Sequence, residues 1–105
     1  MTLSTSEASI EAELKIKGLN APRLTPQDID NTITSAYYHV IPETTVTICA
    51  LTLQNGYVVV GKSAAASPQN FDRAIGERIA REDARNQIWA LEGYLLKEKL
   101  HNQGK

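Results

Sequence analysis

Arginines and aromatic residues recur at helical spacings between residues 71 and 89. Phe71, Arg78, Arg81, Arg85 and Trp89 fall within about 80° of one another on a helical wheel. A guanidinium fork binds phosphate through paired hydrogen bonds, and its plane stacks on an aromatic ring or a base. This pattern therefore indicates a helix face that would bind a nucleotide.

The same segment allows a simpler interpretation, in which the charges form ion pairs on a solvated helix face. Glu77 and Arg81 are four residues apart, the spacing of a helical ion pair. Glu82, Asp83 and Glu92 lie nearby in the sequence. Spacing alone does not separate a ligand site from an ion-paired surface, so both interpretations stay open.

Residues that could carry catalysis or hold a metal are sparse. The sequence contains no nucleophile elbow, P-loop or zinc-ligand spacing. His39 falls in a predicted strand and His101 at a helix end, so no histidine dyad forms. Lys62 beside Ser63 is a candidate phosphate contact or, more simply, an exposed strand lysine. We therefore predict no catalytic residues, no metal, no cofactor and no enzyme activity.

Length, charge and cysteine content restrict the class of protein. A chain of 105 residues is the size of one domain, 1–105, and chains this short often gain stability by oligomerising. The formal net charge of −1 argues against binding nucleic-acid polymers or anionic membranes. The single cysteine, Cys49, suits a reducing cytoplasm as a small buried apolar residue. We expect no membrane span and no signal peptide.

The element that would position the arginines is a long helix over 67–101. Ser67 would cap it, Pro68 would take the first helical position, and no proline interrupts the rest. Its apolar residues form two stripes on different sides: Ala80, Ala84, Ile88, Leu91 and Leu95, and Phe71, Ile75, Trp89, Leu96 and Leu100. Two apolar sides need two partners. We expect the rest of the chain to cover one side and a second copy to cover the other.

Residues 36–64 predict an antiparallel sheet of three strands. β-Branched and aromatic residues gather in the predicted strands, which are Ala36–Ile41, Thr45–Leu53 and Tyr57–Ala64. Gly76, Ala80 and Ala84 recur every four residues, so the long helix can bring its backbone close to the strands.

The pair Asn55-Gly56 predicts the turn between the last two strands. This pair between apolar runs is typical of a type I′ turn, in which both residues have positive φ. Leu53 would then face Val58, and Ala50 would face Gly61. Gly61 would leave a shallow place in the sheet, where a helix could approach closely.

Two short helices are predicted before the sheet. Thr5-Ser6-Glu7-Ala8 would cap an amphipathic helix that ends near Lys17, in a variable segment over 1–20. Thr25 would cap a second helix, which starts at Pro26 and ends near Ser35. The predicted class is α+β: a three-stranded antiparallel meander packed on a long C-terminal helix, with short N-terminal helices.

Residues 20 to 100 also carry several motifs in a fixed order. They are Ala21-Pro22-Arg23-Leu24-Thr25-Pro26, Asn70-Phe71-Asp72, Ala80-Arg81-Glu82-Asp83-Ala84, Trp89, and Leu91 to Leu96. In these the chain resembles a family of small proteins of tailed phages and prophages that includes the Thoeris anti-defence one proteins. Met1–Leu19 and Ile41–Thr44 depart from the family pattern.

The resemblance implies a binding function. Such proteins are phage sponges that sequester a cyclised ADP-ribose isomer made by bacterial TIR-domain enzymes and do not cleave it. Some members also sequester cyclic oligonucleotides, at a separate site created by a hexamer. The resemblance further implies paired C-terminal helices in a homodimer, and the cytoplasm of an infected bacterial host as the location.

The resemblance and the arginine pattern together give a candidate ligand site. Its residues are Tyr57, Asn70, Phe71, Arg78, Arg81, Asp83, Arg85 and Lys97. Phe71 or Tyr57 would stack on adenine, and the arginines would hold phosphates. Asp83 or Asn70 would bond ribose hydroxyls. Trp89 also lies in a family motif, but it is expected in the core.

Two other functions are compatible with the sequence. One is a phage accessory module whose apolar helix face binds a host protein. The other is a small hydrolase of the same signal.

Overall fold

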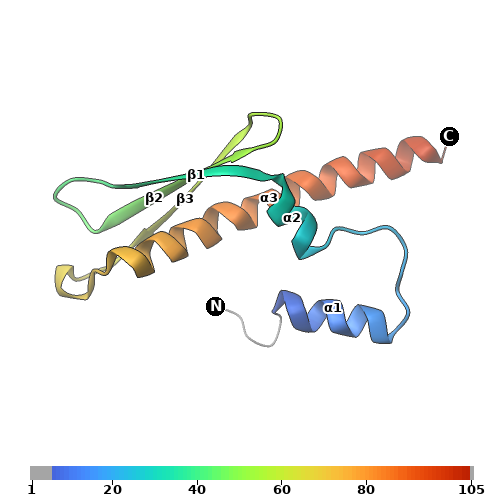
Figure 1. The fold of residues 1–105 in the computed structure, drawn as a ribbon, viewed down its shortest axis with the longest axis horizontal. Coiled ribbons are helices and arrows are strands. Elements are labelled where there is room, and N and C mark those ends of the chain that lie inside the picture. Colours follow the sequence, from blue (N-terminus) through green and yellow to red (C-terminus); the bar gives the residue numbers. More distant parts are fainter. Residues whose placement is uncertain (1–5, 105) are drawn as a thin grey trace.

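The computed structural model describes residues 6–104, which form three helices, three strands and one short 3₁₀ turn (Figure 1). In chain order they are α1 (Glu7–Ile16), α2 (Pro26–Thr32), β1 (Ile33–Val40), β2 (Val46–Leu53), β3 (Val58–Ala64), η1 (Pro68–Asn70) and α3 (Arg73–Gln103). The strands form one antiparallel sheet in the order β1-β2-β3, and α3 packs on it. The predicted α+β class and the meander on a long helix are confirmed.

The core lies between one face of the sheet and one side of α3. Buried and half-buried residues alternate along β2, as expected for a strand with one covered face. The buried apolar residues are Ile29, Cys49, Leu51, Leu53, Val59, Ala80, Ala84 and Ile88. The other face of the sheet stays open: Tyr37 is 65% exposed and Val60 is 51% exposed.

Small residues bring the backbone of α3 against β3. A Cβ atom on Gly61 would lie 2.2 Å from the backbone nitrogen of Ala84 and 2.3 Å from the carbonyl oxygen of Ala80. A Cβ atom on Gly76 would lie 2.8 Å from Oγ1 of Thr47. The predicted close approach of the helix at Gly61 is confirmed.

The turn between β2 and β3 differs from the predicted type I′ turn. The N–H of Leu53 donates to the carbonyl of Tyr57 at 2.8 Å, so three residues form the loop. Gly56 has a φ of 90°, and Asn55 is not among the residues with positive φ. Asn55 instead accepts the N–H of Tyr57 on its side-chain oxygen at 3.0 Å. This bond favours a longer loop, in which glycine alone takes the left-handed conformation.

The longer loop shifts the register of the hairpin by one residue. Val58 lies opposite Thr52, not Leu53, and Gly61 lies opposite Cys49, not Ala50. A shift of one residue exchanges the two faces of a strand. The observed register places Gly61 and Cys49 together on the buried face. The predicted register would have placed Gly61 beside Ala50, on the open face of the sheet.

The long helix begins at Arg73, so the predicted start at Ser67 is wrong. The carboxylate of Asp72 accepts the N–H of Ile75 at 3.0 Å and caps α3, while Ser67 makes no capping bond. A charged cap also interacts favourably with the positive end of a long helix. Phe71 therefore has an extended backbone before the helix, and the helical wheel does not describe its direction.

The two N-terminal helices have the predicted caps. Ser6 accepts the N–H of Ser9 and caps α1, whereas Thr5 lies outside the described residues. Thr25 and Asp28 form a capping box at the start of α2. This helix ends at Thr32, earlier than predicted, because β1 follows directly.

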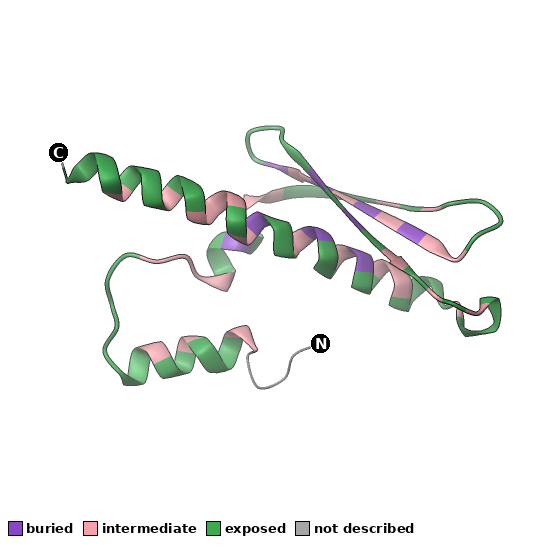
Figure 2. Cartoon of the chain, turned by 180° about the vertical axis from the view of Figure 1, so that it is seen from behind, coloured by how far each residue is buried: buried purple, intermediate pink, exposed green. Residues whose placement is uncertain are grey.

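The C-terminal part of α3 extends past the sheet (Figure 2). In the second half of α3, Tyr94 and Leu95 are 72% and 56% exposed. The radius of gyration is 16.7 Å, compared with about 13 Å for a compact domain of this length. Within one chain, this half of the helix has an apolar side that the described residues leave uncovered.

Candidate functional site

Four of the eight predicted ligand residues lie in two regions along α3. The first region is the arginine face, formed by Arg78, Arg81 and Arg85 on the half of α3 that packs on the sheet. The second is a groove beside the loop that joins β2 and β3, where Tyr57 lies. We call it the hairpin groove, and its residues are given below.

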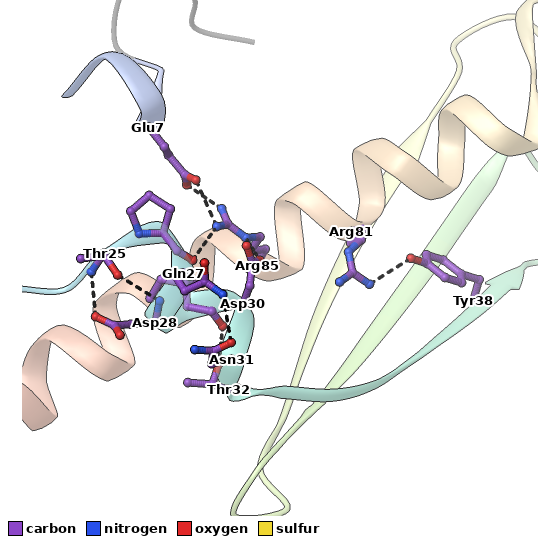
Figure 3. A network of polar contacts seen from close by, with 12 residues as sticks. Glu7, Thr25, Gln27, Asp28, Asp30, Asn31, Thr32, Tyr38, Arg81 and Arg85 are labelled. Atoms are coloured by element: carbon purple, nitrogen blue, oxygen red, sulfur yellow. Dashed lines mark hydrogen bonds and ion pairs between the residues drawn. The ribbon is translucent and has the colours of Figure 1, made fainter. Parts of the chain in front are cut away.

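Arg85 is fully engaged within the chain (Figure 3). Its guanidinium donates to both carboxylate oxygens of Glu7, with Nη2 to Oε1 at 3.0 Å, and its Nε donates to Asp30 at 2.8 Å. Nη2 also donates to the carbonyl of Pro26 at 3.3 Å. The hydrogen bonds that Arg85 donates to Glu7 are the main cause of the raised pKa of Arg85. Arg85 thus joins α1 and α2 to α3. The ion-pair interpretation expected such pairs along the long helix itself, whereas the observed partners come from the two N-terminal helices.

Arg78 and Arg81 differ from Arg85, since neither forms an ion pair within residues 6–104. Glu77, the expected partner of Arg81, instead accepts from Nε of Arg73 at 3.1 Å. Arg81 reaches β1, where its Nη1 lies 3.4 Å from the hydroxyl of Tyr38 (Figure 3). Two like charges one helical turn apart repel each other. An anion bound between them would relieve that repulsion.

Cys49 lies beneath this region and is a buried free thiol. Burial raises its pKa, while a hydrogen bond with Tyr38 and the charge of Arg81 act in the opposite direction. The thiol therefore stays protonated near neutral pH, and a buried thiol is a poor nucleophile. The prediction of a small buried apolar residue is confirmed.

Asp83 lies on the β3 side of α3 and bonds the edge of the sheet. Its Oδ2 accepts the backbone N–H of Lys62 at 3.0 Å. Gln87, one turn further, donates its Nε2 to the carbonyl of Val60 at 2.6 Å. Side chains of α3 thus satisfy polar groups of an edge strand, which would otherwise be open to pairing. This role was not foreseen, because it depends on where the helix crosses β3.

The other predicted ligand residues do not meet in one chain. Asn70 and Phe71 precede α3, Tyr57 lies beside its second half, and Lys97 is exposed on the C-terminal part. The helical stretch from Arg73 to Ala90 spans about 25 Å at 1.5 Å per residue. Phe71 and Tyr57 of the same chain therefore cannot line the same small-molecule pocket.

The hairpin groove is a cavity of about 480 Å³ between the β2–β3 loop, the end of α2 and the second half of α3. Its lining residues are Thr32, Leu53, Gln54, Asn55, Tyr57, Ala90, Leu91, Glu92, Tyr94 and Leu95. This volume lies in the range of small-molecule sites, about 300–1,000 Å³. Of these residues only Tyr57 was among the predicted ligand contacts. Tyr94 and Glu92 were missed, because their approach to the hairpin depends on its register.

A family model described as "Phage protein (N4 Gp49/phage Sf6 gene 66) family" matches residues 24–100. The matched span contains the sheet, the arginine face and the hairpin groove, and it begins after α1. No curated protein and no solved structure matches the chain. Among the described residues, no helix combines the length and apolar character needed to cross a membrane.

Proposed function

The chain belongs to this phage protein family, and we propose that it is an anti-defence sponge that binds cyclic nucleotide immune signals without cleaving them. The signal classes are a cyclised ADP-ribose isomer made by TIR-domain enzymes and cyclic oligonucleotides. The protein would act in the cytoplasm of the infected bacterial host. By holding the signal, it would keep the host effector inactive.

The observation that carries the proposal is the pair Arg78 and Arg81. These arginines lie one turn apart, and within residues 6–104 no carboxylate pairs with either. Arginine binds phosphate oxygens through charge-assisted hydrogen bonds, and its fork fits a phosphate in a bidentate manner. Neighbouring phosphates of a cyclic nucleotide would neutralise both charges at once.

The proposed role is binding alone. Arg81 donates to the hydroxyl of Tyr38, and its charge acts on the buried, protonated thiol of Cys49. Neither supplies a general base near neutral pH. A ligand held by these residues would be oriented and kept, and it would leave unchanged.

The exposed apolar residues on the first half of α3 support a homodimer, with a hexamer as the larger alternative. Ile75 and Ile79 are 46% and 48% exposed. They lie one helical turn apart and form an apolar patch that a second copy would cover. We expect light scattering at micromolar concentration to give at least twice the chain mass of 11.5 kDa; a monomer would remove this support.

The function is tested by mixing excess protein with a panel of cyclic nucleotides and measuring thermal stability. A sponge should gain several degrees with one ligand class. The complex is then denatured, and the released ligand is analysed by mass spectrometry. Intact ligand supports the sponge, whereas a cleaved product would show a hydrolase. The absence of any shift across the panel would contradict the proposal.

The open face of the sheet favours a second candidate, a module that binds a host protein. Tyr37, Val58 and Val60 on this face are 65%, 45% and 51% exposed. An uncovered apolar face of this kind is typical of an interaction surface. This function predicts no thermal shift with any cyclic nucleotide.

A further inference from the structure

The hairpin groove combines an apolar floor with two aromatic walls. Leu53 on the floor is 6% exposed, whereas the residues Tyr57 and Tyr94 are 56% and 72% exposed. One tyrosine comes from the hairpin and the other from α3. Exposed rings from two elements around one cavity are suited to a planar ligand, which gains from stacking.

The polar groups of the groove are mainly acceptors that the chain leaves unused. The amide nitrogen of Gln54 donates to the carbonyl of Asn31, which leaves its oxygen for a ligand. Asn55 accepts from Tyr57 and keeps its amide nitrogen to donate. Glu92 has no ion-pair partner in the described part of the chain. The groove thus offers a carboxylate and an amide oxygen to a ligand rich in N–H donors.

The charge of the groove excludes a phosphate. No arginine or lysine is among its lining residues, and Glu92 would repel an anion. Along α3, Arg81 and Glu92 are separated by about 16 Å at 1.5 Å per residue. The groove is therefore a separate site from the arginine face, with the opposite charge preference.

We propose that the hairpin groove binds an amino-substituted purine, as a free base or nucleoside. The ring stacks between Tyr57 and Tyr94, and the amino group and the adjacent ring N–H donate to the carboxylate of Glu92. Guanine presents two such donors on one edge, which match the two oxygens of a carboxylate. This site does not rest on the sponge function, since it uses neither Arg78 nor Arg81.

The test uses guanosine and inosine, which differ only in the 2-amino group. Binding is followed by NMR, from the backbone amide signals of the full chain in millimolar nucleoside. Guanosine should shift the signals of residues 54–57 and 90–95, and inosine should bind about fivefold or more weakly, because one donor to Glu92 is lost. Guanosine monophosphate should bind no better than guanosine.

Two variants and one control separate the roles of the residues. Tyr94→Ala should weaken guanosine binding roughly five- to a hundred-fold, the range for losing one stacking ring. Because the side chain is exposed, the variant should stay folded. Glu92→Gln should abolish the preference for guanosine over inosine. Glu98→Gln, on the same helix but outside the groove, should bind as the parent does.

Three results would overturn the purine site. The first is a lack of shifts at residues 54–57 and 90–95 with saturating guanosine. The second is unchanged affinity in Tyr94→Ala. The third is movement of these signals on dilution without nucleoside, because a second copy of the chain would then cover the groove. None of these results tests the binding of cyclic nucleotides, which is measured independently with the Arg81→Ala variant.

Discussion

Arg85 and Arg81 lie one turn apart on the same helix, yet their surroundings differ. The side chain of Arg85 is 16% exposed and contacts two carboxylates and a carbonyl. Within residues 6–104, the polar contact of Arg81 is a long hydrogen bond to a tyrosine hydroxyl. The difference arises from residues far away in the sequence, since Glu7 is 78 positions from Arg85. Residue type and spacing therefore identify a row of arginines, but the fold decides which of them stay available to a ligand.

The largest loss of stability should come from separating α3 from the sheet, because the surroundings of Arg81 and Arg85 both depend on that contact. Gly61→Ala would place a Cβ atom 2.2 Å from the backbone of Ala84. A clash with backbone cannot be relieved by a rotamer change, so we expect a loss of about 3 kcal/mol, the upper end for overpacking. Urea denaturation measures it.

Gly93→Ala is the matched control for this substitution. The nearest atom to a Cβ at Gly93 is Cδ1 of Leu24, at 4.0 Å, so the added methyl group fits. Alanine is preferred over glycine within a helix by about 1 kcal/mol, and this variant should therefore be more stable. Equal stability of the two variants would show that α3 does not approach the sheet as described.

The next largest effect tests the structural role of Arg85. Arg85→Ala leaves Glu7 and Asp30 without their cation, and hydrogen bonds to charged groups contribute about 1.5–3 kcal/mol. Because both carboxylates are partly exposed, we expect a loss of about 2 kcal/mol in the free energy of unfolding. Arg85→Lys should recover only part of it, since an ammonium lacks the bidentate fork. A loss no larger than that of Arg81→Ala would remove the distinction between the two arginines.

The reverse pattern is expected for ligand binding at Arg81. Arg81→Ala should cost less than about 1 kcal/mol of stability, because its only contact is long and partly exposed. It should weaken the best cyclic nucleotide of the panel roughly ten- to a hundred-fold, the value of one charge-assisted contact. Arg78→Ala should act in the same direction. Calorimetric titration of both folded variants measures this, and unchanged affinity in both would reject the arginine face as the ligand site.

The features that could be predicted from the sequence depend on local chemistry. Thr25-Pro26 with Asp28 specifies a helix start through neighbouring residues alone. Gly61 in the last strand likewise indicated that the long helix approaches the sheet closely. Ser67 was the predicted cap of the long helix and Asp72 is the observed one, and the choice between them depends on how the chain leaves β3. The predicted type I′ turn at Asn55 was wrong. A single hydrogen bond from the N–H of Tyr57 to the side chain of Asn55 accompanies a longer loop, which shifts the register of the strands.

The candidate site was less predictable, for a related reason. Asp83 and Arg81 are near neighbours in one motif, yet they point to opposite edges of the sheet and contact β3 and β1 respectively. Their separation follows from the line along which α3 crosses the sheet. The partner of Arg85 comes from a segment outside the matched family span, so no motif in residues 24–100 indicates it.

The smallest expected effect isolates the link between α1 and Arg85. Glu7→Gln keeps the size of the side chain and removes its charge, while Asp30 and the carbonyl of Pro26 continue to hold the guanidinium. Glu7 is 41% exposed, so the loss should be below about 1 kcal/mol. α1 has no buried residue, and this ion pair is therefore a main part of its attachment. Hydrogen exchange in residues 7–16 should become faster, while exchange in the strands stays as in the parent. Glu13→Gln, on the same helix but paired only with the exposed Lys17, is the control and should leave exchange in α1 almost unchanged. If Glu7→Gln and Glu13→Gln behave alike, the Arg85–Glu7 pair does not hold α1, and other contacts attach this helix.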